Sequence, residues 1–187
     1  MMAAIRHAMH PPRPCAAGVW RVAGWLALAS AFSGITLPAS HAQAPVQGGA
    51  LKAAYIYNIA LFTTWPVAAG PDKPFAVCAR PSHALWENLR KLEGKHVNGR
   101  PWTLYDVAVG PKVCDITVLP VEAAPGRAPD PVATLFVVDG SAAGKYAGAV
   151  TLVDEEEHVR FDIDTREAAR MGLKFSSRLL RLARNVL

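Results

Sequence analysis

The sequence predicts a single compact α/β domain with one sheet flanked by helices on both faces. Two observations lead to this class. Segments of strand-like pattern alternate along the chain with segments of helical spacing. The run ATLFVVDG, residues 133–140, is apolar on both of its faces, as a central strand of a covered sheet would be. The part of the chain that follows the N-terminal leader is also of a length that suits one domain with a substantial core.

The leader has the composition of a secretory signal peptide. Its only charged residues are three arginines, Arg6, Arg13 and Arg21. The uncharged run VAGWLALASAFSGITL follows, and the small residues Ser40 and Ala42 then predict cleavage after Ala42. The alternative is a transmembrane anchor, but the apolar run is short for a span of about 20 residues. We therefore expect a signal peptide at 1–42, a mature α/β domain at 43–187, and an exported protein.

Removal of the leader changes the charge balance. The whole chain has a formal charge of +5. Without the three leader arginines, 17 lysines and arginines face 15 acidic residues, so the mature chain carries only +2. This balance is not typical of a nucleic-acid-binding protein, and we expect no nucleic-acid partner.

The first half of the mature chain contains two predicted helices and one predicted strand between them. Residues 51–66, LKAAYIYNIALFTTWP, have apolar residues at helical spacing, and Pro66 predicts a stop near Trp65. Residues 75–79, FAVCA, read as a strand. The second helix is predicted over SHALWENLRKLEGK, with Ser82 as its N-cap and Gly94 at its end.

The second half is richer in strands. The predicted strands are 101–109, 114–120, 133–140, 149–154 and 158–164, and a proline-rich loop at 122–132 separates the second from the third. DTREAARMG is predicted to be a short helix that Asp164 or Thr165 caps and Gly172 ends. A closing amphipathic helix is predicted from Ser176 to Leu187.

Two cysteines remain in the mature chain, each in a strand-like run. Cys78 lies in PFAVCA and Cys114 in VCDITVLP. In an oxidising compartment an even pair favours a disulfide, provided that the two strands are neighbours. The alternative is two buried free thiols.

The closing segment is the candidate contact site. On a helix, Leu179, Leu182 and Val186 share an apolar side, which we expect to face the sheet. Ser176 and Ser177 begin this segment, where free backbone N–H groups favour an anion. The candidate residues for a small anionic ligand or an acidic partner surface are Lys174, Ser176, Ser177, Arg178 and Arg181. The alternative is a plain helix cap with no ligand.

Four segments of the mature chain resemble the YfiR family of periplasmic proteins. They are LKAAYIYNIALFTTWP, FAVCARPSHALWENLRKLEGKHVNGRP, CDITVLP and VRFDIDTREAARMGLKFSSRLLRLA. The most specific parts are the first helix ending in Trp65 and Pro66 and the closing AARMGLKFSSRLLRLA. The two cysteines also stand where many members have them. The resemblance implies a small α/β periplasmic regulator.

The resemblance also implies a function. Well-known members bind the periplasmic part of an inner-membrane diguanylate cyclase and repress cyclic di-GMP synthesis, so we expect such a cyclase or a similar sensor as the partner. An outer-membrane-associated protein and a second copy in a homodimer are further partners to consider. The alternative function is binding of a small anionic ligand without a cyclase partner. The mature sequence contains no nucleophile elbow, phosphate-binding loop or metal-binding histidine motif, so we expect a non-enzyme without cofactor or metal.

Overall fold

The computed structural model describes residues 44–66, 70, 72–123, 133–140, 148–156 and 158–187. The chain divides into two units, Met1–Pro38 and Ala39–Leu187, and all described residues lie in the second. The predicted signal peptide therefore lies outside the described residues. None of the described helices is long and apolar enough to cross a membrane.

The helices of this unit are α1 (Ala44–Leu61), α2 (Trp86–Arg90), the 3₁₀ turn η1 (Val121–Ala123), α3 (Thr165–Arg170) and α4 (Ser177–Leu180). The strands are β1 (Thr63–Thr64), β2 (Phe75–Ala79), β3 (His96–Val97), β4 (Arg100–Asp106), β5 (Ile116–Pro120), β6 (Leu135–Asp139), β7 (Val150–Glu155), β8 (His158–Ile163), β9 (Lys174–Phe175) and β10 (Asn185–Val186).

The main sheet is mixed, with the strand order β10-β8-β7-β6-β5-β2-β4-β3. The five strands from β7 to β4 are parallel to one another, whereas β8 is antiparallel to β7 and β3 is antiparallel to β4. The terminal strand β10 pairs in parallel with β8. The predicted α/β class with one main sheet is confirmed.

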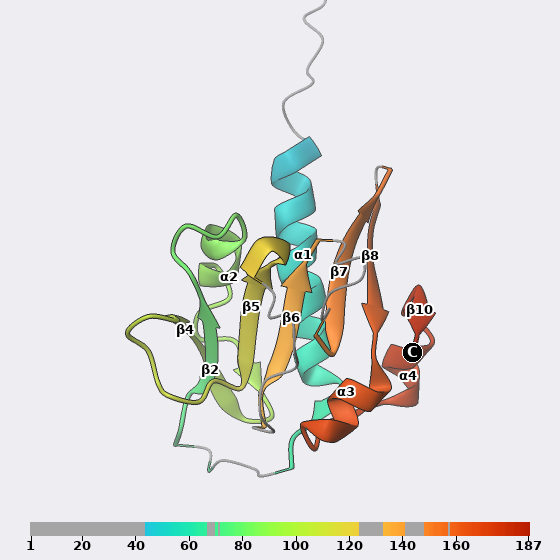
Figure 1. Cartoon of the computed structure of the whole chain (residues 1–187). Coiled ribbons are helices and arrows are strands. Elements are labelled where there is room, and N and C mark those ends of the chain that lie inside the picture. The colour runs from blue at the N-terminus through green and yellow to red at the C-terminus, as the bar shows by residue number, and fades with distance from the viewer. Residues whose placement is uncertain (1–43, 67–69, 71, 124–132, 141–147, 157) are drawn as a thin grey trace, which may run out of the picture. The chain divides into compact units, whose positions relative to one another are not determined.

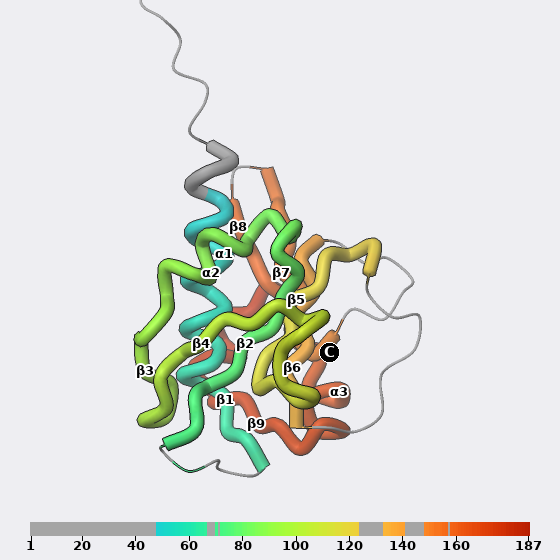
Figure 2. The backbone as a smooth tube through the Cα atoms, turned by 90° about the vertical axis from the view of Figure 1, so that its left-hand side faces the viewer, coloured from blue at the N-terminus to red at the C-terminus, as the bar shows by residue number. Residues whose placement is uncertain are grey.

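Helices lie on both sides of the main sheet, but unevenly. Figure 1 shows α1 behind the strands, and Figure 2 shows α1 and α2 on one side of them with α3 on the other. Helix α3 is short and lies at one end of the sheet, so α1 provides most of the helical cover that the structure describes.

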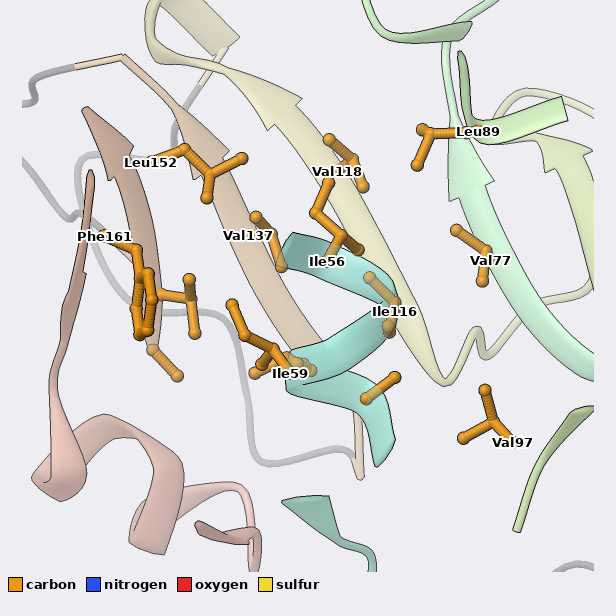
Figure 3. Packing of buried hydrophobic residues seen from close by; sticks show 14 of the residues in the cluster. Ile56, Ile59, Val77, Leu89, Val97, Ile116, Val118, Val137, Leu152 and Phe161 are labelled. Atoms are coloured by element: carbon orange, nitrogen blue, oxygen red, sulfur yellow. The ribbon is translucent and has the colours of Figure 1, made fainter. Parts of the chain in front are cut away.

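The core lies between α1 and the sheet. Ile56 and Ile59 are fully buried and point from α1 toward the strands, where they face Val118, Val137 and Leu152 (Figure 3). Burying one aliphatic side chain of this size contributes about 1.5–3 kcal/mol in transfer free energy. The helical spacing of apolar residues therefore identified this helix but not its bounds. Helix α1 begins before residue 51 and ends at Leu61 and not near Trp65, because the next residues pair with β9.

A second, two-stranded sheet joins the end of α1 to the C-terminal region. Strand β1 pairs with β9 in antiparallel fashion, with Thr63 opposite Phe175 and Thr64 opposite Lys174.

Between β8 and β9, Asp164 caps α3 by accepting hydrogen bonds from the backbone N–H groups of Arg166 and Glu167. Asp164 is thus the cap, out of the two residues that the sequence predicted.

The predicted second helix is too long at both ends, and at its C-terminal end α2 stops at Arg90 and not at Gly94. Helix α2 begins at Trp86, and its N-cap is Leu85 without a side-chain hydrogen bond, so Ser82 is not the cap. Residues 81–85 form turns instead, in which the N–H of His83 donates to the carbonyl of Arg80 at 2.9 Å. The turns place His83 in the interior, where it is 8% exposed, and this delays the start of the helix.

Candidate functional site

The predicted contact residues lie together on one turn of the chain, from Lys174 to Arg181, which we call the cationic turn. It consists of β9, the residue Ser176 and α4 with its C-cap. The side chains of Lys174, Ser177, Arg178 and Arg181 are exposed. Four of the five predicted residues are therefore on the surface of the described part of the chain, and Ser176 is half-buried.

The cationic turn is held in place by hydrogen bonds to the end of α1. The N–H of Ser176 donates to the carbonyl of Phe62 at 3.0 Å. The hydroxyl oxygen of Ser176 accepts a hydrogen bond from the N–H of Leu179 at 3.2 Å, and Leu179 itself is 2% exposed. Ser176 therefore acts as the N-cap of α4, and its hydroxyl is already engaged.

The three cations of this turn differ in whether another side chain holds them in place. The guanidinium carbon of Arg178 lies 5.5 Å from the centre of the Phe62 ring, which is a cation–π contact. Lys174 and Arg181 have no ion-pair partner among the described residues. A partner with acidic side chains would therefore meet one positioned and two free cations.

Our prediction for the closing helix is wrong beyond its first turn. Helix α4 ends at Leu180, and the chain then enters the edge strand β10. Leu182 is 64% exposed and Val186 is 48% exposed, so neither faces the sheet, in contrast to Leu179.

Asn185 of β10 and Arg184, the residue before this strand, hold the C-terminal segment against β8 through Asp162. The Nε and Nη2 atoms of Arg184 donate to the two carboxylate oxygens of Asp162 at 2.9 and 2.6 Å. Asn185 also donates to Asp162, at 3.0 Å. The hydrogen bond from Arg184, reinforced by Asn185, lowers the pKa of Asp162 although partial burial opposes it.

The predicted Cys78–Cys114 disulfide is present in the structure. It joins β2 to the residue that leads into β5, with a Cα–Cα distance of 6.0 Å across a sequence separation of 36. Cys78 is fully buried and Cys114 is 7% exposed. The two runs that carry them are neighbours, as the sequence argument required, because β2 and β5 pair in parallel.

A buried ion-pair cluster at the carboxyl ends of β6 and β7 was missed by the sequence analysis. Lys52 of α1 donates from its Nζ atom to Asp139 at 2.8 Å and to Asp154 at 2.6 Å. The side chains of Lys52 and Asp139 are 11% and 13% exposed, whereas that of Asp154 is 63% exposed. Burial lowers the pKa of Lys52, but the hydrogen bonds to the two carboxylates outweigh it and raise the pKa above its usual value.

His83 lies near this cluster. Its Nδ1 atom accepts a hydrogen bond from the N–H of Leu85 at 3.1 Å. Its Nε2 atom is buried and has no hydrogen bond of good geometry in the described part of the chain. The carbonyl of Leu119 is close enough to favour the protonated form of the His83 ring. Burial nevertheless lowers the pKa of His83, and nearby Asp139 only partly opposes this.

These buried polar groups have a signal in the sequence. Lys52 is a lone charge within an apolar helix, and Asp139 ends an apolar strand. The carboxyl ends of parallel strands are a common location for ligand-binding sites in α/β proteins. Within the described ranges, no group of three or more His, Cys, Asp or Glu side chains could hold a metal ion.

A match to a protein family places the chain among known proteins. The model of the YfiR/HmsC-like family matches residues 49–184, which is most of the chain. No curated protein has significant sequence similarity to it.

Proposed function

Because the chain belongs to the YfiR/HmsC-like family, we propose that it is a periplasmic regulator that represses an inner-membrane diguanylate cyclase and lowers cyclic di-GMP. The family match over residues 49–184 is the observation that carries this proposal. YfiR-like proteins are regulators of cyclic di-GMP signalling rather than enzymes. The disulfide fits such a location, because disulfides persist in oxidising compartments such as the periplasm.

A repressor of this kind acts through a preorganised surface. It shifts a cyclase toward the inactive state only if it binds that state more tightly than the active one. The cationic turn has the required rigidity, since β1, the Phe62 carbonyl and the Ser176 cap hold it. Its cations would meet acidic side chains on the periplasmic part of the cyclase, which gives both steering and specificity.

The contact can be tested by affinity capture from envelope extract, with the purified protein as bait and mass spectrometry as the readout. We expect the wild type to enrich a membrane protein that carries a diguanylate cyclase domain. Arg181→Glu reverses a charge that has no stacking partner among the described residues, and Arg178→Glu also removes the contact with Phe62. Both should reduce the captured cyclase about tenfold or more.

Lys91→Glu is the matched control for this experiment. Lys91 is exposed in the turn after α2, and its replacement changes the net charge by the same amount. If Lys91→Glu reduces capture as much as Arg181→Glu does, net charge rather than the cationic turn determines binding. If both arginine variants capture the cyclase as well as the wild type, the contact surface lies elsewhere.

A further inference from the structure

A pocket of about 470 Å³ opens beside the disulfide, well away from the cationic turn in sequence. Its volume is within the range of about 300–1,000 Å³ that is usual for small-molecule sites. It is lined by Trp65, Lys73, Pro74, Ala76, Arg100, Tyr105, Pro111, Val113, Cys114, Asp115 and Ala133. These residues come from the β1–β2 connection, from β2 and β4, and from the loops that lead into β5 and β6.

The charged pair in this pocket is already fully engaged. Arg100, which is 8% exposed, donates to the two carboxylate oxygens of Asp115 at 2.7 Å each. The same guanidinium donates to the carbonyls of Lys73 at 3.1 Å and Pro74 at 2.6 Å. Asp115 also accepts from the N–H of Ala76 at 2.8 Å. The pair therefore forms a rigid, neutral wall and offers no free charge to a ligand.

The other walls are aromatic and aliphatic, and they are held in place. Trp65 packs edge-on against Phe75, with ring centres 5.1 Å apart. On the loop after β4, the N–H of Gly110 donates to the carbonyl of Asp106 at 2.8 Å. A Cβ at Gly110 would come within 2.8 Å of Tyr105 Cβ, so only glycine lets this loop lie against Tyr105. The disulfide fixes Cys114 on the remaining side.

Among the described lining residues, one charged group is free, the ammonium group of Lys73. Lys73 is exposed, and within the described part of the chain its side chain has no ion-pair partner. The pocket thus combines a flat apolar interior, a neutral polar wall and one cation at its edge. We propose that it binds a small aromatic monoanion, whose ring system lies against Trp65 and Tyr105 and whose anionic group meets Lys73. This inference does not depend on the cyclase contact.

A matched pair of fluorescent probes tests the proposal on the purified protein. The anion 8-anilinonaphthalene-1-sulfonate and the uncharged N-phenyl-1-naphthylamine share one ring skeleton and differ by the sulfonate. We expect the anion to bind more tightly to the wild type in a fluorescence titration. Lys73→Gln should weaken the anion about fivefold and leave the uncharged probe within a factor of two, because only the charged contact is lost.

Two tryptophan variants on the same loop locate the binding site. Val113 lines the pocket and is 55% exposed, whereas Val109 is 84% exposed and is not part of the lining. Val113→Trp should fill the mouth of the pocket and weaken both probes about tenfold or more, whereas Val109→Trp should leave both Kd values within a factor of two. The proposal is overturned if the wild type binds neither probe, if the uncharged probe binds as tightly as the anion, or if Val113→Trp binds both like the wild type.

Discussion

Replacing Cys78 and Cys114 together with alanine should lower the free energy of unfolding by about 4 kcal/mol. The bridge closes a loop with a sequence separation of 36. In the chain-entropy relation, a loop of this length removes about 13 cal/mol/K from the unfolded state, which corresponds to about 4 kcal/mol at 25 °C. Alanine suits both positions, because Cys78 and Cys114 are buried and alanine is a small apolar residue.

The assay is equilibrium unfolding in urea followed by far-ultraviolet circular dichroism. The double variant should unfold at a lower urea concentration than the oxidised wild type. The wild type with its disulfide reduced should lose a similar amount of stability. The same reductant should leave the double variant unchanged, which shows that the effect comes from this bridge.

A loss below about 1 kcal/mol would refute the loop-closure reasoning, since the relation requires several times more for this separation. A shift of the double variant by reductant would show that the reagent acts elsewhere. Alkylation gives an independent check, because the unfolded but unreduced protein should leave both thiols unlabelled.

Three further predictions concern the core and the buried charges. Leu179→Ala should destabilise the protein by about 2–5 kcal/mol and Leu182→Ala by less than about 0.5 kcal/mol in urea unfolding, because only the first side chain is buried. Equal losses would contradict the observed end of α4. Lys52→Met should reduce stability by about 3–5 kcal/mol, because it leaves the buried carboxylate of Asp139 unpaired, and a variant as stable as the wild type would speak against the ion pair. Since burial lowers the pKa of His83, the unfolded state binds its proton more readily, so stability should fall as the pH drops below about 6.5. His83→Gln should flatten this dependence between pH 7 and pH 5, and an unchanged slope would assign it to other groups.

Local signals in the sequence were sufficient for several parts of the fold. Apolar spacing identified α1, and the paired cysteines in strand-like runs identified the disulfide. The Asp164 cap and the end of α3 near Gly172 were also predictable, because a side-chain cap and a glycine with φ of 73° involve only neighbouring residues.

Parts determined by distant contacts could not be predicted in this way. The apolar spacing after Leu180 is helical, but pairing with β8 and the contact of Arg184 with Asp162 turn that segment into an edge strand. Lys52 meets aspartates that lie 87 and 102 residues away in the chain. For the cationic turn, the sequence identified the cations and left open whether the serines bind an anion or cap the helix. The hydrogen bond from the N–H of Leu179 shows that Ser176 is the cap.

The intracellular concentration of cyclic di-GMP tests the central claim most directly. It should be measured by mass spectrometry in the native host, in a deletion strain, and in that strain after complementation with an exported or a cytoplasmically retained form. Repression of a membrane-bound cyclase from the periplasm predicts a rise on deletion and a return to the wild-type level with the exported form alone. An unchanged concentration in the deletion strain, or full restoration by the retained form, would contradict it.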